Sequence, residues 1–105
     1  MIARIWHGYT TKENAGAYEN LLKEEIFVGI GEKNIKGYKG IRLLRRELED
    51  ETEFTTIMQF ENIEDVKLFA GEDYETAYVP EKARMILKRF DQKSAHYQII
   101  YELNY

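Results

Sequence analysis

The residues best suited to chemistry stand near the two ends of the chain. Trp6 and His7 are adjacent in the segment Ile2–Tyr9, and His96 lies in the last apolar segment. A histidine near its ordinary pKa can take a proton from a substrate, and an indole N–H can donate a hydrogen bond to a substrate or peroxide oxygen. Two alternatives stay open: Trp6 as a core residue, and the histidines as strand-end residues that hydrogen-bond locally.

Two arginines stand within segments that are otherwise apolar. If Arg4 or Arg42 points inward, its guanidinium could hold a phenolate or a carboxylate. The alternative is an arginine that extends to a sheet edge or crosses a dimer interface in an ion pair. Tyr74 and Tyr78 could stack on an aromatic ligand or simply pack, and Met58 suits either a core or a pocket wall.

The sequence contains no strong catalytic or metal-binding motif. With no cysteine, disulfides, thiolate metal sites and cysteine nucleophiles are excluded. The two histidines lack a third convergent ligand and do not stand in an H-E-x-x-H spacing, so we expect no metal site. No phosphate-binding loop or activated nucleophile is present either. A non-catalytic binding protein is therefore the rival to any enzyme.

Length, composition and charge narrow the class of protein. With 105 residues, 44% of them apolar, we expect one domain over residues 1–105 with a true core. A net charge of −4 argues against nucleic-acid binding, which needs a basic surface. No apolar run approaches the roughly 20 residues of a membrane span, and no secretion signal is seen. We therefore expect a cytoplasmic protein without a membrane partner.

The N-terminal third of the chain predicts a strand followed by a helix. Ile2–Tyr9 has apolar residues at both even-numbered and odd-numbered positions, which is typical of a strand covered on both faces. Thr10–Glu13 fits a capping box, and the helical spacing after it predicts a helix to about Phe27 or Val28. Two glycines that follow are expected to end this helix.

The remaining segments alternate between strand and helix patterns. Strands are predicted over Tyr38–Glu47, Phe54–Glu61 and Ser94–Glu102, and helices over Ile63–Ala70 and Glu81–Lys88. The first two of these strands are joined by a short acidic turn and should form a hairpin. Asn62 is expected to cap one helix, Gly71 to stop it, and Pro80 to precede the other.

This order of elements predicts an α+β fold. Right-handed crossovers turn it into a ferredoxin-like split β-α-β arrangement with an antiparallel four-stranded sheet. The first strand then lies between the third and the last, so His7 and His96 could face each other across two neighbouring strands. Helices would cover one face only. The other apolar face is most simply covered by the sheet of a second chain, so we expect a homodimer through the sheet faces.

Four segments also indicate a family: Met1–Gly8, Leu44–Glu47, Phe69–Asp73 and His96–Tyr97. They resemble the antibiotic biosynthesis monooxygenase-like family of the dimeric α+β barrel superfamily, over essentially the whole chain. The resemblance implies a pocket in each subunit, between the helices and the concave sheet. Trp6 resembles a position at which family members place a pocket residue.

The best-understood members of that family oxygenate electron-rich phenolic polyketides without metal or flavin. The resemblance thus implies a cofactor-independent monooxygenase acting on a small aromatic or polyketide-like molecule. For such an enzyme the candidate catalytic residues are Trp6, His7 and His96. Such an enzyme must deprotonate the phenol, hold the anion and exclude water. The substrate contacts expected are Arg4, Arg42, Met58, Phe69, Tyr74 and Tyr78.

Two positions depart from relatives with known chemistry. Haem-degrading members need a helical histidine, whereas Asp73–Pro80 contains tyrosines and no histidine, so haem cleavage is not expected. Some oxygenase members use a second tryptophan where Phe69 stands, and the phenylalanine ring cannot donate a hydrogen bond. The alternative function is therefore a non-catalytic, small-molecule-binding dimeric α+β barrel protein.

Overall fold

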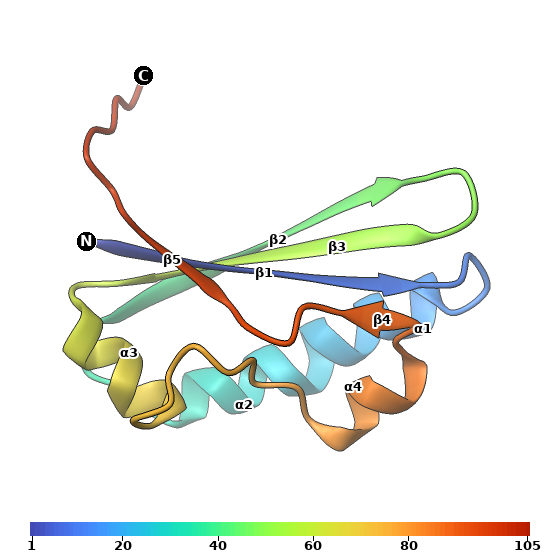
Figure 1. The fold of residues 1–105 in the computed structure, drawn as a ribbon, viewed down its shortest axis with the longest axis horizontal. Coiled ribbons are helices and arrows are strands. Elements are labelled where there is room, and N and C mark those ends of the chain that lie inside the picture. The colour runs from blue at the N-terminus through green and yellow to red at the C-terminus, as the bar shows by residue number, and fades with distance from the viewer.

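A five-stranded antiparallel sheet with all its helices on one face makes up the structure, a computed structural model that describes residues 1–105 (Figure 1). The strands are β1 (Ile2–Thr10), β2 (Tyr38–Glu47), β3 (Thr52–Phe60), β4 (Arg89–Phe90) and β5 (Ala95–Gln98). They run in the order β2-β3-β1, and both β4 and β5 pair with the far edge of β1. The expected α+β fold, with the first strand inside the sheet, is confirmed.

The prediction of one long last strand over Ser94–Glu102 was wrong. That side of β1 pairs with two short strands, which makes five strands instead of four. Asp91 explains the interruption. Its carboxylate Oδ2 accepts a hydrogen bond from the His7 amide at 3.0 Å, in the place where a backbone carbonyl of a regular neighbouring strand would accept it. Just after it, residues 92–94 pair with residues 75–77 instead of with β1. After β5 only the Ile99 amide continues the pairing, by donating to the Met1 carbonyl.

The first helical region both starts and ends about four residues later than expected. It comprises α1 (Ala15–Leu21), a π-helical segment η1 (Leu22–Ile26) and α2 (Phe27–Glu32). The predicted capping box was wrong, because Thr10 is a fully buried strand residue paired with Thr52. Gly29 and Gly31 lie inside α2 and do not end it. The buried side chain of Ile30 between them offsets the roughly 1 kcal/mol that each helical glycine costs.

The later elements follow the sequence pattern more closely. β2 has the predicted bounds, and β3 begins two residues before the expected start and ends one before the expected end. α3 (Ile63–Ala70) is capped as predicted: Asn62 Oδ1 accepts from the Asp65 amide at 3.0 Å, and Gly71 follows with φ 89°. α4 (Glu81–Ile86) stops two residues before the predicted end. None of these helices combines the length and the apolar surface that a membrane span requires.

The two faces of the sheet differ in cover. Along β3 every even-numbered residue is buried under the helices, from Thr52 to Phe60, while the odd-numbered ones are half-exposed on the opposite face. We call these the covered face and the open face. Figure 1 shows the helices lined up along one side of the sheet, and the C-terminal segment rising from its edge on the other side. The core therefore lies on the covered face only.

Candidate functional site

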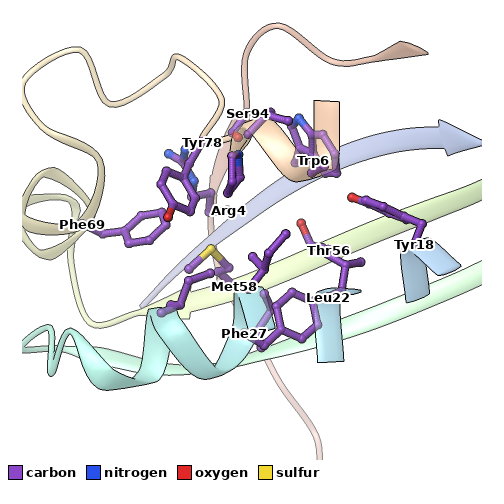
Figure 2. A pocket seen from close by; sticks show the side chains of 16 residues that line it. Arg4, Trp6, Tyr18, Leu22, Phe27, Thr56, Met58, Phe69, Tyr78 and Ser94 are labelled. Atoms are coloured by element: carbon purple, nitrogen blue, oxygen red, sulfur yellow. The ribbon is translucent and has the colours of Figure 1, made fainter. Parts of the chain in front are cut away.

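A small cavity lies on the covered face, between the sheet and the helices (Figure 2). Its volume is about 50 Å³, it is partly open, and 12 of its 16 lining residues are hydrophobic. A few polar groups in a mostly apolar wall are typical of a small-molecule site. In this conformation the volume holds roughly three to five water molecules, so an aromatic ligand requires the cavity to widen. Figure 2 shows Arg4, Phe69 and Tyr78 at one end of the cavity and Trp6 and Tyr18 at the other.

Arg4 is the charged residue of the cavity wall, and it has no carboxylate partner. Its side chain is buried, with 3% of the residue exposed. Nη1 donates to the Tyr74 carbonyl at 2.5 Å and contacts His96 Nε2 at 2.9 Å, while Nη2 donates to the Thr76 carbonyl at 3.3 Å. Burial lowers the pKa of Arg4 to about 10, so the guanidinium stays charged at neutral pH. A buried cation with only neutral partners favours an anionic ligand.

His96 lies beside Arg4 because the two residues are direct partners across the β1–β5 pair. Burial, and then the charge of Arg4, lower the pKa of His96, which is therefore neutral at pH 7. An arginine can only donate, so His96 Nε2 accepts and the ring proton sits on Nδ1. The Tyr74 ring packs edge-on against the imidazole at 5.2 Å. His96 thus holds the guanidinium in place, and its basic nitrogen is already occupied.

Trp6 forms one end of the cavity, yet its indole N–H does not point to a ligand. Nε1 donates to the Asp91 carbonyl at 2.9 Å, so the expected donation to a substrate or peroxide oxygen was wrong. The ring lies close over Gly8, where an added Cβ would be 2.5 Å from Trp6 Cη2. Glycine at this position lets the indole lie along its own strand. Trp6 therefore contributes its aromatic surface to the cavity.

The prediction that His7 and His96 face each other was also wrong. The position beside the end of β1 is taken by β4, where Gly8 pairs with Phe90, and His96 falls opposite Arg4. Because side chains alternate along a strand, His7 and Arg4 point to opposite faces, and His96 shares the face of Arg4. His7 Nδ1 instead contacts Asp91 Oδ2 at 2.8 Å on the open face.

The other expected substrate contacts fall into two groups. Met58, Phe69 and Tyr78 line the cavity together with Arg4 and Trp6. Arg42 does not, since it is an exposed residue of the open face and pairs with Ile57. Tyr74 does not line the cavity either, because its ring packs on His96.

Several wall residues were missed from the sequence. The polar ones are Tyr18, Thr56 and Ser94. Thr56 stands on the same strand parity as Met58, a signal that would have identified it. Tyr18 is fully buried, and this burial raises the pKa of its phenol. Ser94 is buried in the irregular segment before β5, and no sequence pattern indicated it.

The helix wall of the cavity includes the π-helical segment. Leu22 and Ile26, the ends of η1, line the cavity together with Phe27 and Ile30. The Phe27 amide donates to the Leu22 carbonyl, five residues back, which is the bond that defines a π turn. Such segments are frequent at functional sites, but the sequence spacing gave no indication of one here.

No group of three His, Asp or Glu side chains is close enough to hold a metal ion. A comparison with solved structures finds a putative antibiotic biosynthesis monooxygenase from Bacillus cereus. The likeness has a TM-score of 0.69 and covers 99% of this chain and 95% of that chain, at 13% sequence identity. Protein-family models and curated proteins contain no match to the sequence. At this identity the likeness shows a shared fold, and it confirms the α+β fold expected for the single chain.

Proposed function

We propose that this protein binds a small aromatic anion in the cavity beside Arg4 and oxygenates it without a bound cofactor. The observation behind the proposal is a buried guanidinium that lines an apolar cavity and has no carboxylate partner. A phenolate or a carboxylate oxygen would complete its hydrogen bonding, and charge-assisted bonds of this kind are strong in a water-poor site. The ligand class is thus a planar aromatic molecule with one acidic hydroxyl or carboxyl group.

The proposed reaction uses the electron-rich ring of the ligand itself. A phenolate gives one electron to dioxygen, the resulting superoxide joins the ring carbon as a peroxide, and loss of water leaves a carbonyl group. A CH₂ group and one O₂ become C=O and H₂O, so no external reductant is consumed. Arg4 stabilises the anion, and the apolar wall excludes water from the intermediates. His96 and the carbonyls of Tyr74 and Thr76 keep Arg4 in position.

A second candidate function is binding without catalysis. It is favoured by the lack of a free proton acceptor at the cavity: His96 Nε2 is bonded to Arg4, and burial raises the pKa of Tyr18. A ligand that is not acidic enough to ionise next to Arg4 would then be held without reacting. The protein would shield or carry the molecule.

Trp6 provides the test, because it is the chain's only tryptophan and lies on the cavity wall. We would titrate the protein with anthrone-like phenols, quinones, flavin and haem while following tryptophan fluorescence and oxygen uptake. The proposal expects a saturable change with the acidic phenols, accompanied by oxygen uptake. Saturable binding without uptake would support the carrier function. Neutral quinones binding as tightly as phenolates would contradict the role of Arg4.

We also propose that two chains form a homodimer through their open faces. Leu44 and Tyr97 are exposed on that face, 47% and 57%, and Ile57 is half-exposed there. The C-terminal segment on the same side exposes further apolar side chains, among them Ile100 and Tyr101. A mass in solution of twice 12.5 kDa is expected at micromolar concentration, and Ile57→Glu should halve it. A monomeric mass for the unchanged chain would contradict the dimer.

A further inference from the structure

The cavity beside Arg4 shares a wall with a larger hollow at the surface. Phe69 and Tyr78 border both spaces, the inner one of about 50 Å³ and an outer one of about 270 Å³. The two rings meet edge to face, with centroids 5.4 Å apart. The inner cavity, which is partly open, is too small for an aromatic ligand in this conformation. If the ring wall moves, the two spaces become one of adequate size.

A lysine lies over both rings of this wall. Lys33 Nζ is 4.5 Å from the centroid of Tyr78 and 5.2 Å from that of Phe69, at distances typical of cation–π contacts. Arg4 contacts Phe69 as well, with its guanidinium carbon 5.5 Å from the ring centroid. Lys33 takes part in no ion pair, in contrast to Lys12, which pairs with a glutamate. Its charge is therefore available to an incoming anion.

The two rings differ in how firmly they are held. Phe69 belongs to α3 and is 8% exposed, packed against the Phe60 ring in the core. Tyr78 lies in the irregular segment between α3 and α4 and is 45% exposed. Moving the Tyr78 ring outward therefore loses little buried area, whereas moving Phe69 would disrupt the core. Tyr78 is the part of the wall that can open.

We propose that Tyr78 is a gate between the outer hollow and the Arg4 cavity, and that Lys33 holds it closed and selects anionic ligands. This inference rests on the proposed function of the Arg4 cavity. An aromatic anion in the outer hollow pairs with Lys33, which then releases the Tyr78 ring, and the ligand moves on to Arg4. The one carboxylate that borders the hollow, that of Asp73, accepts a hydrogen bond from the Thr76 hydroxyl at 2.7 Å. Neutral and cationic molecules gain nothing from Lys33.

The gate can be tested without any ligand, by quenching Trp6 fluorescence with acrylamide, a small neutral molecule. Lys33→Met removes the cation–π contacts, which are worth a change of about two- to five-fold in the open population. The quenching constant should rise by that factor, and Tyr78→Ala should raise it at least as much. Lys36→Met is the matched control, since Lys36 is exposed and has no contact with the wall. All three positions are exposed enough for the variants to fold, which far-ultraviolet circular dichroism would verify.

Iodide, an anionic quencher, tests the charge selection. The quantity to compare is the ratio of the iodide quenching constant to the acrylamide quenching constant. We expect this ratio to be lower in Lys33→Met than in the unchanged protein, and to be unchanged in Lys33→Arg. Unchanged acrylamide quenching in both Lys33→Met and Tyr78→Ala would overturn the gate, as would an equal rise in Lys36→Met. An iodide ratio unaffected by Lys33→Met would overturn the selection. None of these results depends on ligand binding to Arg4, so the gate and the proposed function fail separately.

Discussion

The two faces of the sheet carry the same kinds of side chain in opposite surroundings. Both faces carry arginine and histidine, and two pairs can be compared directly: Arg4 and His96 on the covered face, Arg42 and His7 on the open face. Arg4 is buried without a carboxylate partner, and His96 bonds to it. On the open face Arg42 is exposed and His7 contacts Asp91. Strand parity, more than residue type, therefore decides which of them can serve a binding site.

The largest expected effect separates core packing on the two faces. Phe54 is fully buried on the covered face, edge-on to Tyr18 at 4.9 Å, whereas Ile57 is half-exposed on the open face. Phe54→Ala should lower the free energy of unfolding by about 3–5 kcal/mol because it leaves a cavity. Ile57→Ala should cost roughly 1 kcal/mol or less in the monomer, where the side chain is already partly hydrated. Denaturant unfolding of the dilute protein measures both, and equal losses would contradict the one-sided core.

The next effect concerns the space under the Trp6 ring. Gly8→Ala would place a methyl group against the indole and Leu87, 2.5 Å from the nearest indole carbon. Such overpacking should lower the free energy of unfolding by about 1–3 kcal/mol and alter the emission of Trp6. Gly16→Ala is the control, since Gly16 lies in an exposed turn of α1 with nothing within 4 Å. It should stabilise the protein by up to about 1 kcal/mol, and a Gly8→Ala variant that is equally stable would show that the ring position is loose.

A smaller effect should appear in the pH dependence of stability. The pKa of His96 is lowered from 6.5 in the folded protein, so the unfolded chain binds a proton more readily. The contribution of His96 to the free energy of unfolding is fully present above pH 6.5. It is lost as the pH falls from there through the folded-state pKa. His96→Gln should therefore lose less stability than the unchanged protein between roughly pH 7 and pH 5. His7→Gln keeps His96 and should keep this part of the loss; the reverse result would show that His7 is the coupled residue.

Local patterns predicted the fold well where one face is buried. The alternation of apolar residues in β3 placed Met58 on the face opposite to Ile57, and the Asn62 cap and Gly71 bounded α3 as predicted. These signals need only neighbours in sequence, since burial on one face repeats with the period of the strand or helix.

The errors arose where distant segments meet. Asp91 interrupts the last strand by accepting the His7 amide, and this places His96 opposite Arg4. The local patterns around Asp91 and His96 do not reveal these contacts with β1. The register of the strand pair depends on residues more than 80 positions apart in the chain. The same holds for the indole N–H of Trp6, whose acceptor is also the carbonyl of Asp91. The cavity and Arg4 were expected, but the polar wall residues Tyr18, Thr56 and Ser94 were not.

The central claim is that the buried Arg4 binds the ligand, and a comparison of Arg4 with Arg42 provides a direct test. Arg4→Met and Arg42→Met remove the same charge from opposite faces and keep similar side-chain length. With an acidic phenol that saturates the Trp6 signal, Arg4→Met should raise Kd about 10- to 100-fold, the value of a charge-assisted hydrogen bond. Arg42→Met should leave Kd unchanged. An unaltered Kd in Arg4→Met, or an equal loss in both variants, would contradict the assignment of the site.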